Sequence, residues 1–435
     1  MTSLDTTCLD NFITYDKHHH SLMVEGVSLL DIAQQYGTPF YCYSSASIID
    51  AIMQYKNIFQ ASPLPVSIHY AVKANCRLAI LNIMKANNIG LDIVSLGEMM
   101  AGQKAGFSTK DMIYSGVGKT YDDIAYAVNN HIGQLNVESF DEIDMLLDIV
   151  AKHPPHHPIN VAVRVNPHIA TGGHEKISTG KAGDKFGIDF DSALPAYQKL
   201  LSSAHLKPKM IAMHIGSQLT DKTLLKKAYQ ALAGLITQLY HANVQLTSID
   251  IGGGMAIAYH DEVPLPLDDY AKLVMAIFAP LKKIGITDII IEPGRSLVGR
   301  AGLLVTRVVL QKKSAGRHIV VVDTAMNDLI RPTLYHAYHP ILPVKKPPET
   351  IDIKTQDIVG GICETGDFLA LARKLPCFNN GDMLALFYVG AYGSAMASNY
   401  NSRLLPTEIL IKGKEYFVIR PRQTYKNLFA LENCL

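Results

Sequence analysis

Short apolar runs alternate with amphipathic stretches along the first two thirds of the chain. The stretches between the runs have helical spacing, and some begin at a capping residue, such as Ser139 with Glu142 three positions later or Thr120 ahead of two aspartates. Strand and helix alternate eight times, which predicts an α/β fold with a closed (β/α)8 barrel of TIM type. The predicted barrel spans residues 36–292, close to the roughly 250 residues typical of that fold. The eight apolar runs with the length of buried strands are Val66 to Ala71, Gly90 to Val94, Met112 to Ser115, Leu135 to Val137, Ile159 to Val165, Met210 to Ile215, Ser248 to Ile251 and Ile289 to Ile291.

The pattern changes on both sides of this barrel. After Arg295 the helical period fades, and extended runs punctuated by glycine and proline take over. They predict a β-rich C-terminal domain, of sandwich or barrel-like form, over residues 293–435. We expect residues 1–35 to form a short extended arm that packs with this domain. The extended runs are Leu303 to Leu310, His318 to Val322, Thr350 to Ile353, Met383 to Val389, Glu408 to Ile411 and Tyr416 to Ile419.

Polar residues follow the predicted barrel strands. Active sites of such barrels lie at the carboxyl ends of the strands, so these side chains are expected to share one face and to form the site. The alternative is that strand ends are polar simply because loops are. The residues are Lys73, Ser95, Ser115, Glu138, Arg164 with Asn166, His214, Gly252 to Gly254, and Glu292.

Composition narrows the class of function. The chain has 435 residues, 48% of them apolar and 18% charged, enough to bury a sizeable core. Forty basic residues against thirty-nine acidic ones give no field that favours nucleic acid or an anionic membrane, so we expect a small-molecule substrate. The N-terminus has no apolar segment of a secretory signal, and no run reaches membrane-spanning length. These features predict a cytoplasmic protein.

Cysteine and histidine usage argues against metal and disulfide frameworks. The six cysteines are scattered without a CxxC pair, so most are expected to be inert core residues. His18 to His20 lie in a polar N-terminal stretch, where solvent-facing histidines are favoured over metal ligands. We therefore predict no metal site. The cysteines are Cys8, Cys42, Cys76, Cys363, Cys377 and Cys434.

Lys73 is the candidate nucleophile. It follows the apolar run that ends at Ala71, and Val72 and Ala74 flank it. Partial desolvation there would lower the pKa of the amine and allow it to form a Schiff base. The alternative is an ordinary surface lysine at a strand end.

Further candidate site residues follow the last two predicted strands and the sixth. Gly252 to Gly254 close the seventh strand, and amide groups of a glycine turn can bind a phosphate, although a flexible turn is the commoner use of three glycines. Glu292 closes the eighth strand and precedes Arg295. An acid at that place can keep a pyridine nitrogen cationic in pyridoxal phosphate chemistry, or form an ordinary salt bridge. His214 has a flat ring suited to stacking on such a cofactor, but a lone histidine is more often structural.

Together these residues resemble the fold-type III pyridoxal phosphate enzymes, which include alanine racemase and the basic amino-acid decarboxylases. The β-rich C-terminal part and the run Ile362 to Asp367 favour a decarboxylase, and the chain from Tyr41 to Tyr400 is similar to the diaminopimelate decarboxylase family. The distinguishing runs are His174 with Ile177 to Gly180, Lys185 to Ile188, Asn327 to Tyr335 and Gly390 to Gly393. Thr365, where serine is common, and a varied loop at Ala170 to Gly173 are slight departures.

The resemblance implies roles for individual residues. Lys73 would hold pyridoxal 5'-phosphate covalently, His214 would stack on its ring, and Glu292 would meet its pyridine nitrogen. Cys363 would reprotonate the substrate carbon. The family is dimeric, so a homodimer is expected in which Cys363 and Glu364 enter the partner's site. The remaining cofactor contacts would be Ser217, Gly253, Gly254, Gly294, Arg295 and Tyr392, and the substrate contacts would be Arg295, Arg331, Tyr335, Glu364 and Tyr392.

The implied reaction converts meso-2,6-diaminopimelate to L-lysine and carbon dioxide, the last step of bacterial lysine synthesis. Arg295 or Arg331 would grip the distal carboxylate of this substrate and Glu364 its ammonium group, so that ornithine and lysine would leave an arginine unpaired. Three alternatives stay open at this stage: a decarboxylase of ornithine, arginine or carboxynorspermidine, an alanine racemase, and a catalytically silent relative that binds a partner protein.

Overall fold

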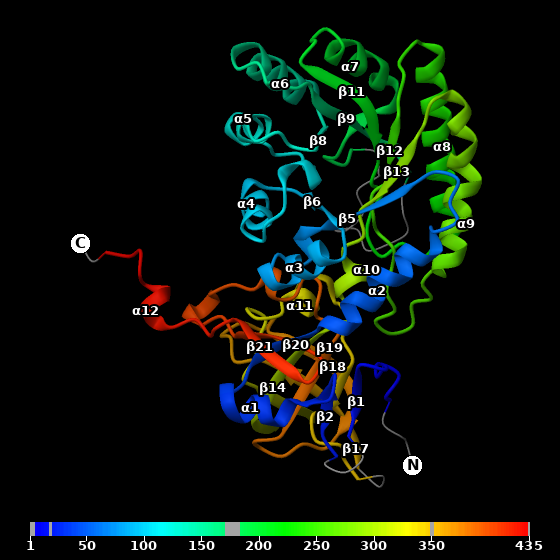
Figure 1. Cartoon of the computed structure of the whole chain (residues 1–435). Helices are drawn as coiled ribbons and strands as arrows, with labels where there is room; N and C mark the ends of the chain where they lie inside the picture. Colours follow the sequence, from blue (N-terminus) through cyan, green and yellow to red (C-terminus); the bar gives the residue numbers. More distant parts are fainter. Residues whose placement is uncertain (1–4, 17–19, 170–182, 349–351, 434–435) are drawn as a thin grey trace. The chain divides into compact units, whose positions relative to one another are not determined.

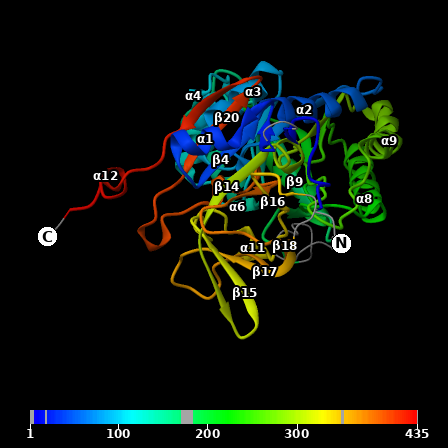
Figure 2. The ribbon, with the colours of Figure 1, turned by 90° about the horizontal axis from the view of Figure 1, so that it is seen from below.

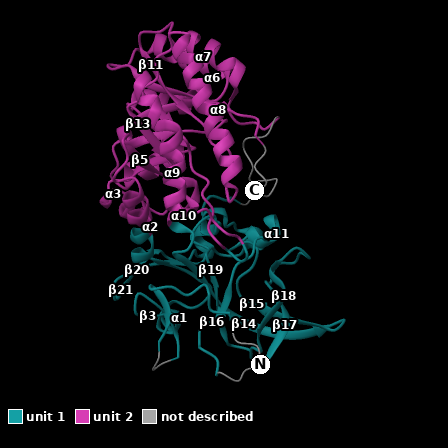
Figure 3. Ribbon diagram, turned by 90° about the vertical axis from the view of Figure 1, so that its right-hand side faces the viewer, with its two compact units in different colours: residues 1–50, 259–261, 298–435 teal, residues 51–258, 262–297 magenta. Residues whose placement is uncertain are grey.

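The computed structural model describes residues 5–16, 20–169, 183–348 and 352–433 (Figure 1). The chain divides into two compact units, shown in different colours in Figure 3. The barrel unit comprises residues 51–258 and 262–297. The β unit comprises residues 1–50, 259–261 and 298–435.

Eight parallel strands of the barrel unit form a closed ring. They run in the order β9, β11, β12, β13, β5, β6, β7, β8, and the pairing of β8 with β9 closes the ring. The short strand β10 (Ile188–Asp189) pairs with β9 outside the ring. The predicted TIM-type barrel is thereby confirmed. The ring strands are β5 (Val66–Ala71), β6 (Gly90–Ile93), β7 (Met112–Tyr114), β8 (Gln134–Val137), β9 (Ile159–Asn166), β11 (Leu206–Ala212), β12 (Ser248–Asp250) and β13 (Asp288–Ile291).

The sixth ring strand starts earlier than its sequence suggests. β11 begins at Leu206, whereas the apolar run predicts a start at Met210. Two lysines and Pro208 interrupt the apolar pattern there, and the pairing with β9 shifts register between Lys207 and Met210. A proline within a strand tends to lie at such an irregularity. The apolar pattern therefore does not reveal the first residues of the strand.

Helices alternate with the strands of the barrel unit, and α5, α6 and α8 each bury an apolar stripe. The start of α5 has a full capping box between Thr120 and Asp123. The start of α6 keeps half of the predicted box: Ser139 accepts from the Glu142 amide, but the Glu142 carboxylate accepts from the amide of Glu138 instead. The helices are α3 (Leu78–Ala86), α4 (Leu96–Lys104), α5 (Tyr121–Asn129), α6 (Phe140–Lys152), α7 (Ala193–Leu200), α8 (Lys222–His241), α9 (Leu267–Phe278) and α10 (Arg295–Val298), and α2 (Ser45–Ile58) enters the unit from the β unit.

The β unit is built on a second sheet in the order β18, β17, β15, β14, β4, β20, β21. The pair β16 and β19 joins it through β14, and α12 (Tyr425–Leu428) projects away from these strands (Figure 2). The C-terminal β-rich domain is thereby confirmed. The strands are β4 (Phe40–Ser44), β14 (Gly302–Ser314), β15 (Arg317–Val322), β16 (Ile341–Pro343), β17 (Ile353–Val359), β18 (Phe368–Pro376), β19 (Met383–Phe387), β20 (Thr407–Lys412) and β21 (Glu415–Arg420).

The N-terminal segment belongs to the β unit but is not simply extended. It forms a small sheet of β1 (Ile13–Tyr15), β2 (Leu22–Val24) and β3 (Val27–Ser28), and then helix α1 (Leu29–Tyr36). Ser28 caps this helix by accepting from two backbone amides, and Leu29, Ile32 and Ala33 are buried. The expectation of an extended arm is therefore wrong for α1.

Residues 40–44 lie in the β unit rather than in the barrel. Strand β4 pairs antiparallel with β14 and parallel with β20, so the barrel unit starts at Ala51 and not near the predicted residue 36. The amide of Leu22 also donates to the Val344 carbonyl at 2.7 Å, which attaches the N-terminal segment to this unit.

The structure also bears on membrane spans, metal sites and disulfides, none of which the sequence predicts. No helix in the described ranges is both long and apolar enough to cross a bilayer. Within the same ranges no group of three or more histidine, cysteine and acidic side chains is arranged to hold a metal ion. The five cysteines there are free thiols, and Cys8 and Cys42 are buried. Of the three adjacent histidines only His20 lies in a described range, where it is exposed.

Candidate functional site

Lys73 lies just past the end of β5, in a single 3-10 turn, Val72–Ala74. Its Nζ is 3.0 Å from Oδ2 of Asp92, a residue of β6 whose side chain is fully buried. The ion pair brings together two neighbouring strands of the ring, because β5 and β6 pair directly. The lysine amine is therefore held at the carboxyl ends of the strands, where the sequence predicts the site.

The ion pair changes the interpretation of this lysine. The sequence suggests that partial desolvation activates the amine. In the structure the side chain is 36% exposed and its amine is paired with a carboxylate. Activation of the amine by partial desolvation stays a prediction. Asp92 fixes where the amine points.

Asp250 and Glu292 form a buried carboxyl pair at the ends of β12 and β13. Burial, followed by the neighbouring charges of Asp250 and Asp92, raises the pKa of Glu292 well above its usual value. Burial also raises the pKa of Asp250 to about 6. One oxygen of each residue, Oε1 of Glu292 and Oδ2 of Asp250, has no hydrogen-bond partner among the described residues. Such buried oxygens are rare in proteins and suggest a missing donor.

His214 lies beyond β11 with its ring against the glycine turn. The amide of Gly253 donates to Nδ1 of His214 at 3.3 Å, so Nδ1 carries no proton. Removal from water, with the nearby positive charges of Lys73 and Arg164, lowers the pKa of His214 well below its usual value. The neutral form of the ring is therefore favoured, and its flat face is suited to stacking.

The three glycines after β12 are needed by backbone packing. Gly252 and Gly254 have positive φ angles of 65° and 106°. A Cβ atom on Gly253 would overlap the Glu292 carbonyl oxygen, and one on Gly254 would overlap the carbonyl oxygen of Gly216. The loops after β11, β12 and β13 therefore approach one another through bare backbone. This explains the glycines without a phosphate, and phosphate binding stays a prediction.

Ser217 and Arg295 meet beside this turn. Arg295 is 6% exposed and donates from Nε and Nη2 to the Ser217 hydroxyl, at 3.3 and 2.9 Å. Gly294, just before it, lies against Ala71, whose Cβ would be 3.0 Å from a Cβ on the glycine. The structure thus brings together two residues that the sequence assigns to the cofactor, from loops 78 residues apart.

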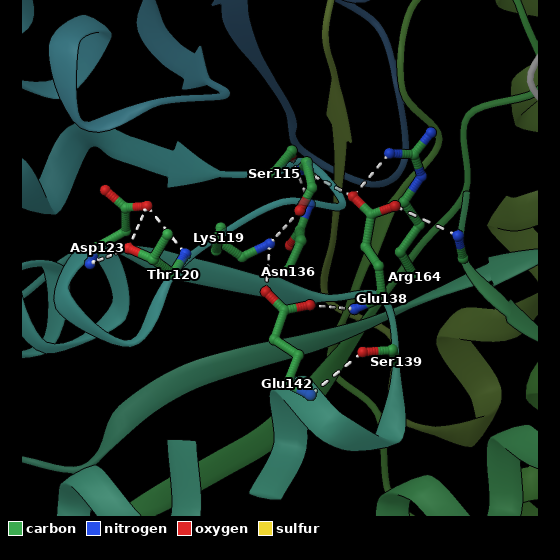
Figure 4. Close-up of polar contacts among 11 residues, drawn as sticks. Ser115, Lys119, Thr120, Asp123, Asn136, Glu138, Ser139, Glu142 and Arg164 are labelled. Carbon is green, nitrogen blue, oxygen red and sulfur yellow. Dashed lines mark hydrogen bonds and ion pairs between the residues drawn. The ribbon is translucent and has the colours of Figure 1, made fainter. Parts of the chain in front are cut away.

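A buried polar network forms the neighbouring wall of the ring (Figure 4). Glu138, at the end of β8, lies 2.8 Å from Nη1 of Arg164 and accepts from the amides of Gly116 and Gly187. Lys119 pairs with Glu142 at 2.5 Å. Both pairs are almost fully buried, so each charge depends on its partner. The network fixes the strand ends that carry Ser115, Glu138 and Arg164.

Five predicted site residues lie in the β unit. Arg331 and Tyr335 belong to α11 (Arg331–Tyr335), and Arg331 is only 5% exposed. Tyr392 has a positive φ of 57° and is half-buried. Cys363 and Glu364 are both exposed.

The exposed turn of Cys363 and Glu364 is built on a buried carboxylate. Asp367 accepts hydrogen bonds at 2.7 Å from the amides of Met326 and Ile362. The amide of Cys363 donates to Oδ1 of Asn401 at 3.1 Å, which fixes the turn from outside. The thiol is thus accessible on a firmly held backbone.

Sequence reasoning missed two members of the barrel site. Asp92 and Asp250 both lie inside apolar strand runs, and neither is assigned a role by its sequence. A lone carboxylate within a buried strand is itself unusual, because an ionised group there needs a partner. An aspartate within a buried strand is thus the sequence signal that could have identified both residues. The motif residues 174 and 177–180 lie outside the described residues.

Three comparisons with known proteins agree. A family model described as the pyridoxal binding domain of pyridoxal-dependent decarboxylases matches residues 45–299. Over 423 residues the chain is 39% identical to the diaminopimelate decarboxylase of Zymomonas mobilis subsp. mobilis, covering 97% of this chain and 98% of that protein.

Solved structures agree with this similarity. Diaminopimelate decarboxylase from Helicobacter pylori complexed with L-lysine has a TM-score of 0.87 at 37% identity, with 93% of this chain and 98% of that chain covered. The diaminopimelate decarboxylase from M. jannaschi has a TM-score of 0.91 at 31% identity and covers 98% of both chains.

Proposed function

The chain belongs to the pyridoxal-dependent decarboxylases, and within them to the diaminopimelate decarboxylase family, and we propose that it uses pyridoxal 5'-phosphate to convert meso-2,6-diaminopimelate to L-lysine and carbon dioxide. Decarboxylation of ornithine, arginine or carboxynorspermidine is disfavoured, because relatives that match almost the whole chain are named diaminopimelate decarboxylases. The same similarity disfavours an alanine racemase.

The barrel site fits the proposed cofactor. The main support for the proposal is Oε1 of Glu292, a buried acceptor without a hydrogen-bond partner among the described residues. The charge of Lys73 also acts on this carboxyl group and lowers its pKa. The ring N–H of a pyridinium is the kind of donor this oxygen lacks. When bound, the pyridoxal ring supplies an electron sink for the electron pair that carbon dioxide leaves behind.

We assign the cofactor contacts to residues of the barrel unit. Lys73 provides the amine for covalent attachment, and Asp92 holds that amine in place at 3.0 Å. His214, neutral and anchored by Gly253, offers a flat face for stacking. For the phosphate we assign Gly253 and Gly254 of the glycine turn, together with Ser217, Gly294 and Arg295, because backbone amides and a guanidinium suit this group.

Glu292 would hold the ring nitrogen of the cofactor, with Asp250 beside it. Burial and the nearby charges of Asp250 and Asp92 raise the pKa of Glu292, which favours its protonated form in the cofactor-free protein. Once a positive charge faces it, the carboxylate form becomes favourable. Asp250 supports this arrangement and accepts from the amide of Gly252 at 2.9 Å.

Substrate contacts and the final proton transfer are assigned to the β unit. Arg331 offers a planar, charged fork for a substrate carboxylate, with Tyr335 and Tyr392 as further contacts, and Glu364 suits the distal ammonium. The proton on the exposed thiol of Cys363 passes to the α-carbon after carbon dioxide has left, and solvent water restores it.

Purified protein supplied with meso-diaminopimelate and the cofactor tests this function. Stoichiometric release of lysine and carbon dioxide is expected, with ornithine and arginine turned over at least about 100-fold more slowly, because neither can pair the arginine for the distal carboxylate. Borohydride reduction followed by peptide mass spectrometry should place the cofactor on Lys73. An adduct on another lysine, or faster turnover of ornithine, would contradict the proposal.

The assembly and location are also proposals. We propose a homodimer in which Cys363 and Glu364 of each subunit enter the partner's site; their exposure is compatible with such a role. A cytoplasmic location stays a prediction of the sequence.

A further inference from the structure

His339 lies beside Arg331 in the β unit, and its ring forms hydrogen bonds with Arg331 and with the backbone of Phe387. Its ring is fully buried. Nε2 is 2.9 Å from Nη1 of Arg331, and Nδ1 is 2.8 Å from the carbonyl oxygen of Phe387. A guanidinium can only donate and a carbonyl can only accept, so these two contacts define the tautomer. The proton is on Nδ1, the ring is neutral, and Nε2 accepts from the arginine.

The backbone around His339 is fixed from several directions. Its carbonyl oxygen accepts from Nη2 of Arg373 at 2.9 Å. The amide of Phe387 donates to the carbonyl of Pro340 at 2.8 Å, and the next residues form the pairing of β16 with β19. The imidazole therefore has little freedom to move away from Arg331.

A tyrosine ring restricts the same guanidinium on another side. The Tyr259 ring centroid is 4.7 Å from Cζ of Arg331, within the range of a cation–π contact. The same ring meets His339 edge-to-face, with centroids 5.4 Å apart. Tyr388 and Arg300 continue this packing away from Arg331. The guanidinium of Arg331 is thus oriented by a hydrogen bond to His339 and by the aromatic face of Tyr259.

We propose that His339, supported by Tyr259, is a positioning residue that orients Arg331 for the carboxylate of the substrate. The proposal rests on the substrate role of Arg331 given above. A guanidinium binds a carboxylate through two parallel hydrogen bonds only when its plane is correctly oriented. An arginine whose plane is not held should therefore bind the substrate more weakly, while the rate of the chemical step changes less. His339 itself does not touch the substrate in this role.

Two substitutions at position 339 separate positioning from packing. His339→Leu fills the space but cannot accept from Arg331, and its KM for meso-diaminopimelate should rise about tenfold or more while kcat changes less than about threefold. His339→Gln places an amide oxygen near the position of Nε2 and should keep KM within about threefold of wild type. His336→Gln is the matched control, because His336 is exposed and its ring stacks on Phe368 instead.

A double-mutant cycle with Arg331→Ala separates this proposal from the proposed function. If His339 acts through Arg331, His339→Leu should raise KM no further in the Arg331→Ala background. A full additional rise there, or an unchanged KM in a folded His339→Leu enzyme, would overturn the positioning role. An unchanged KM in Arg331→Ala alone would instead overturn the substrate role of the arginine. Should His339→Leu fail to fold, Tyr259→Leu measured against Tyr259→Phe gives the same comparison, because only leucine removes the aromatic face.

Discussion

Single residues of the barrel site act mainly through the charges that surround them. The amine of Lys73 is partly exposed and is directed by a buried carboxylate, whereas burial beside Asp250 raises the pKa of Glu292. His214 is kept neutral by the same desolvation and by nearby cations. The three groups therefore differ in protonation because their environments differ, which is the usual way that enzymes assign acid and base roles.

Asp92→Asn tests the direction of the lysine amine. The amide keeps the size of the side chain but loses the charge that holds Nζ at 3.0 Å. We expect kcat/KM to fall about tenfold or more, and borohydride trapping at Lys73 to become slower. Asp148→Asn is the control, because Asp148 pairs with Lys152 on an exposed helix surface. Equal kinetics for both variants would show that the Asp92 charge is dispensable.

Asp250→Asn tests the buried carboxyl pair through pH. Burial raises the pKa of Asp250 from 3.8 to about 6, so the folded protein holds a proton that the unfolded chain releases between about pH 4 and pH 6. Stability of the cofactor-free protein therefore falls as pH rises through this window, and it stays lower above pH 6. Asparagine removes this dependence. Denaturant unfolding at pH 4.5 and 7 should show a loss of stability that is smaller in the variant by about 2 kcal/mol. An unchanged difference would show that the pKa of Asp250 is not raised by folding.

At the scale of elements, the sequence predicted what is periodic and missed what depends on distant partners. Strands of a closed parallel barrel are covered on both faces, so β7 and most of β13 are continuous runs of buried apolar residues. Strand β4 is just as apolar, but it pairs with β14 and β20, which lie more than 250 residues further along the chain, so its membership of the β unit could not be found locally.

The same limit explains the site. Lys73, His214, Glu292 and the glycines follow strands at recognisable places, and the resemblance to a family gave them roles. Asp92 and His339 act through partners brought close only by folding: Asp92 meets the lysine 19 positions before it, and His339 is held by a carbonyl 48 positions after it. Local sequence contains neither relation.

Gly253→Ala tests the close approach of the loops after β12 and β13. A Cβ at this position overlaps the carbonyl oxygen of Glu292, and backbone atoms on both sides cannot move away cheaply. We expect a loss of about 2 kcal/mol or more in the free energy of unfolding, together with weaker cofactor binding. Gly234→Ala is the matched control: it lies within α8 with nothing within 4 Å of the added atom. That variant should be stabilised by about 0.5 to 1 kcal/mol. A stable Gly253→Ala protein with normal cofactor affinity would contradict the packing argument.

At the scale of the whole molecule, the proposed dimer makes a prediction that no single subunit can satisfy. Lys73 belongs to the barrel unit, whereas Cys363 lies on an exposed turn of the β unit. If each subunit supplies Cys363 to its partner, a mixed dimer of Lys73→Ala and Cys363→Ala subunits contains one native site.

Complementation between these two variants measures that sharing. Random mixing makes half of the dimers mixed, each with one native site of two, so co-expression should restore about a quarter of wild-type specific activity. Lys73→Ala mixed with Glu292→Ala is the control: both residues belong to the barrel unit, so every site in the mixed dimer keeps a defect. Recovery only in the first mixture would support the shared site. Activity no higher than that of Cys363→Ala alone, from mixtures that gel filtration shows to be dimeric, would place Cys363 in the site of its own subunit.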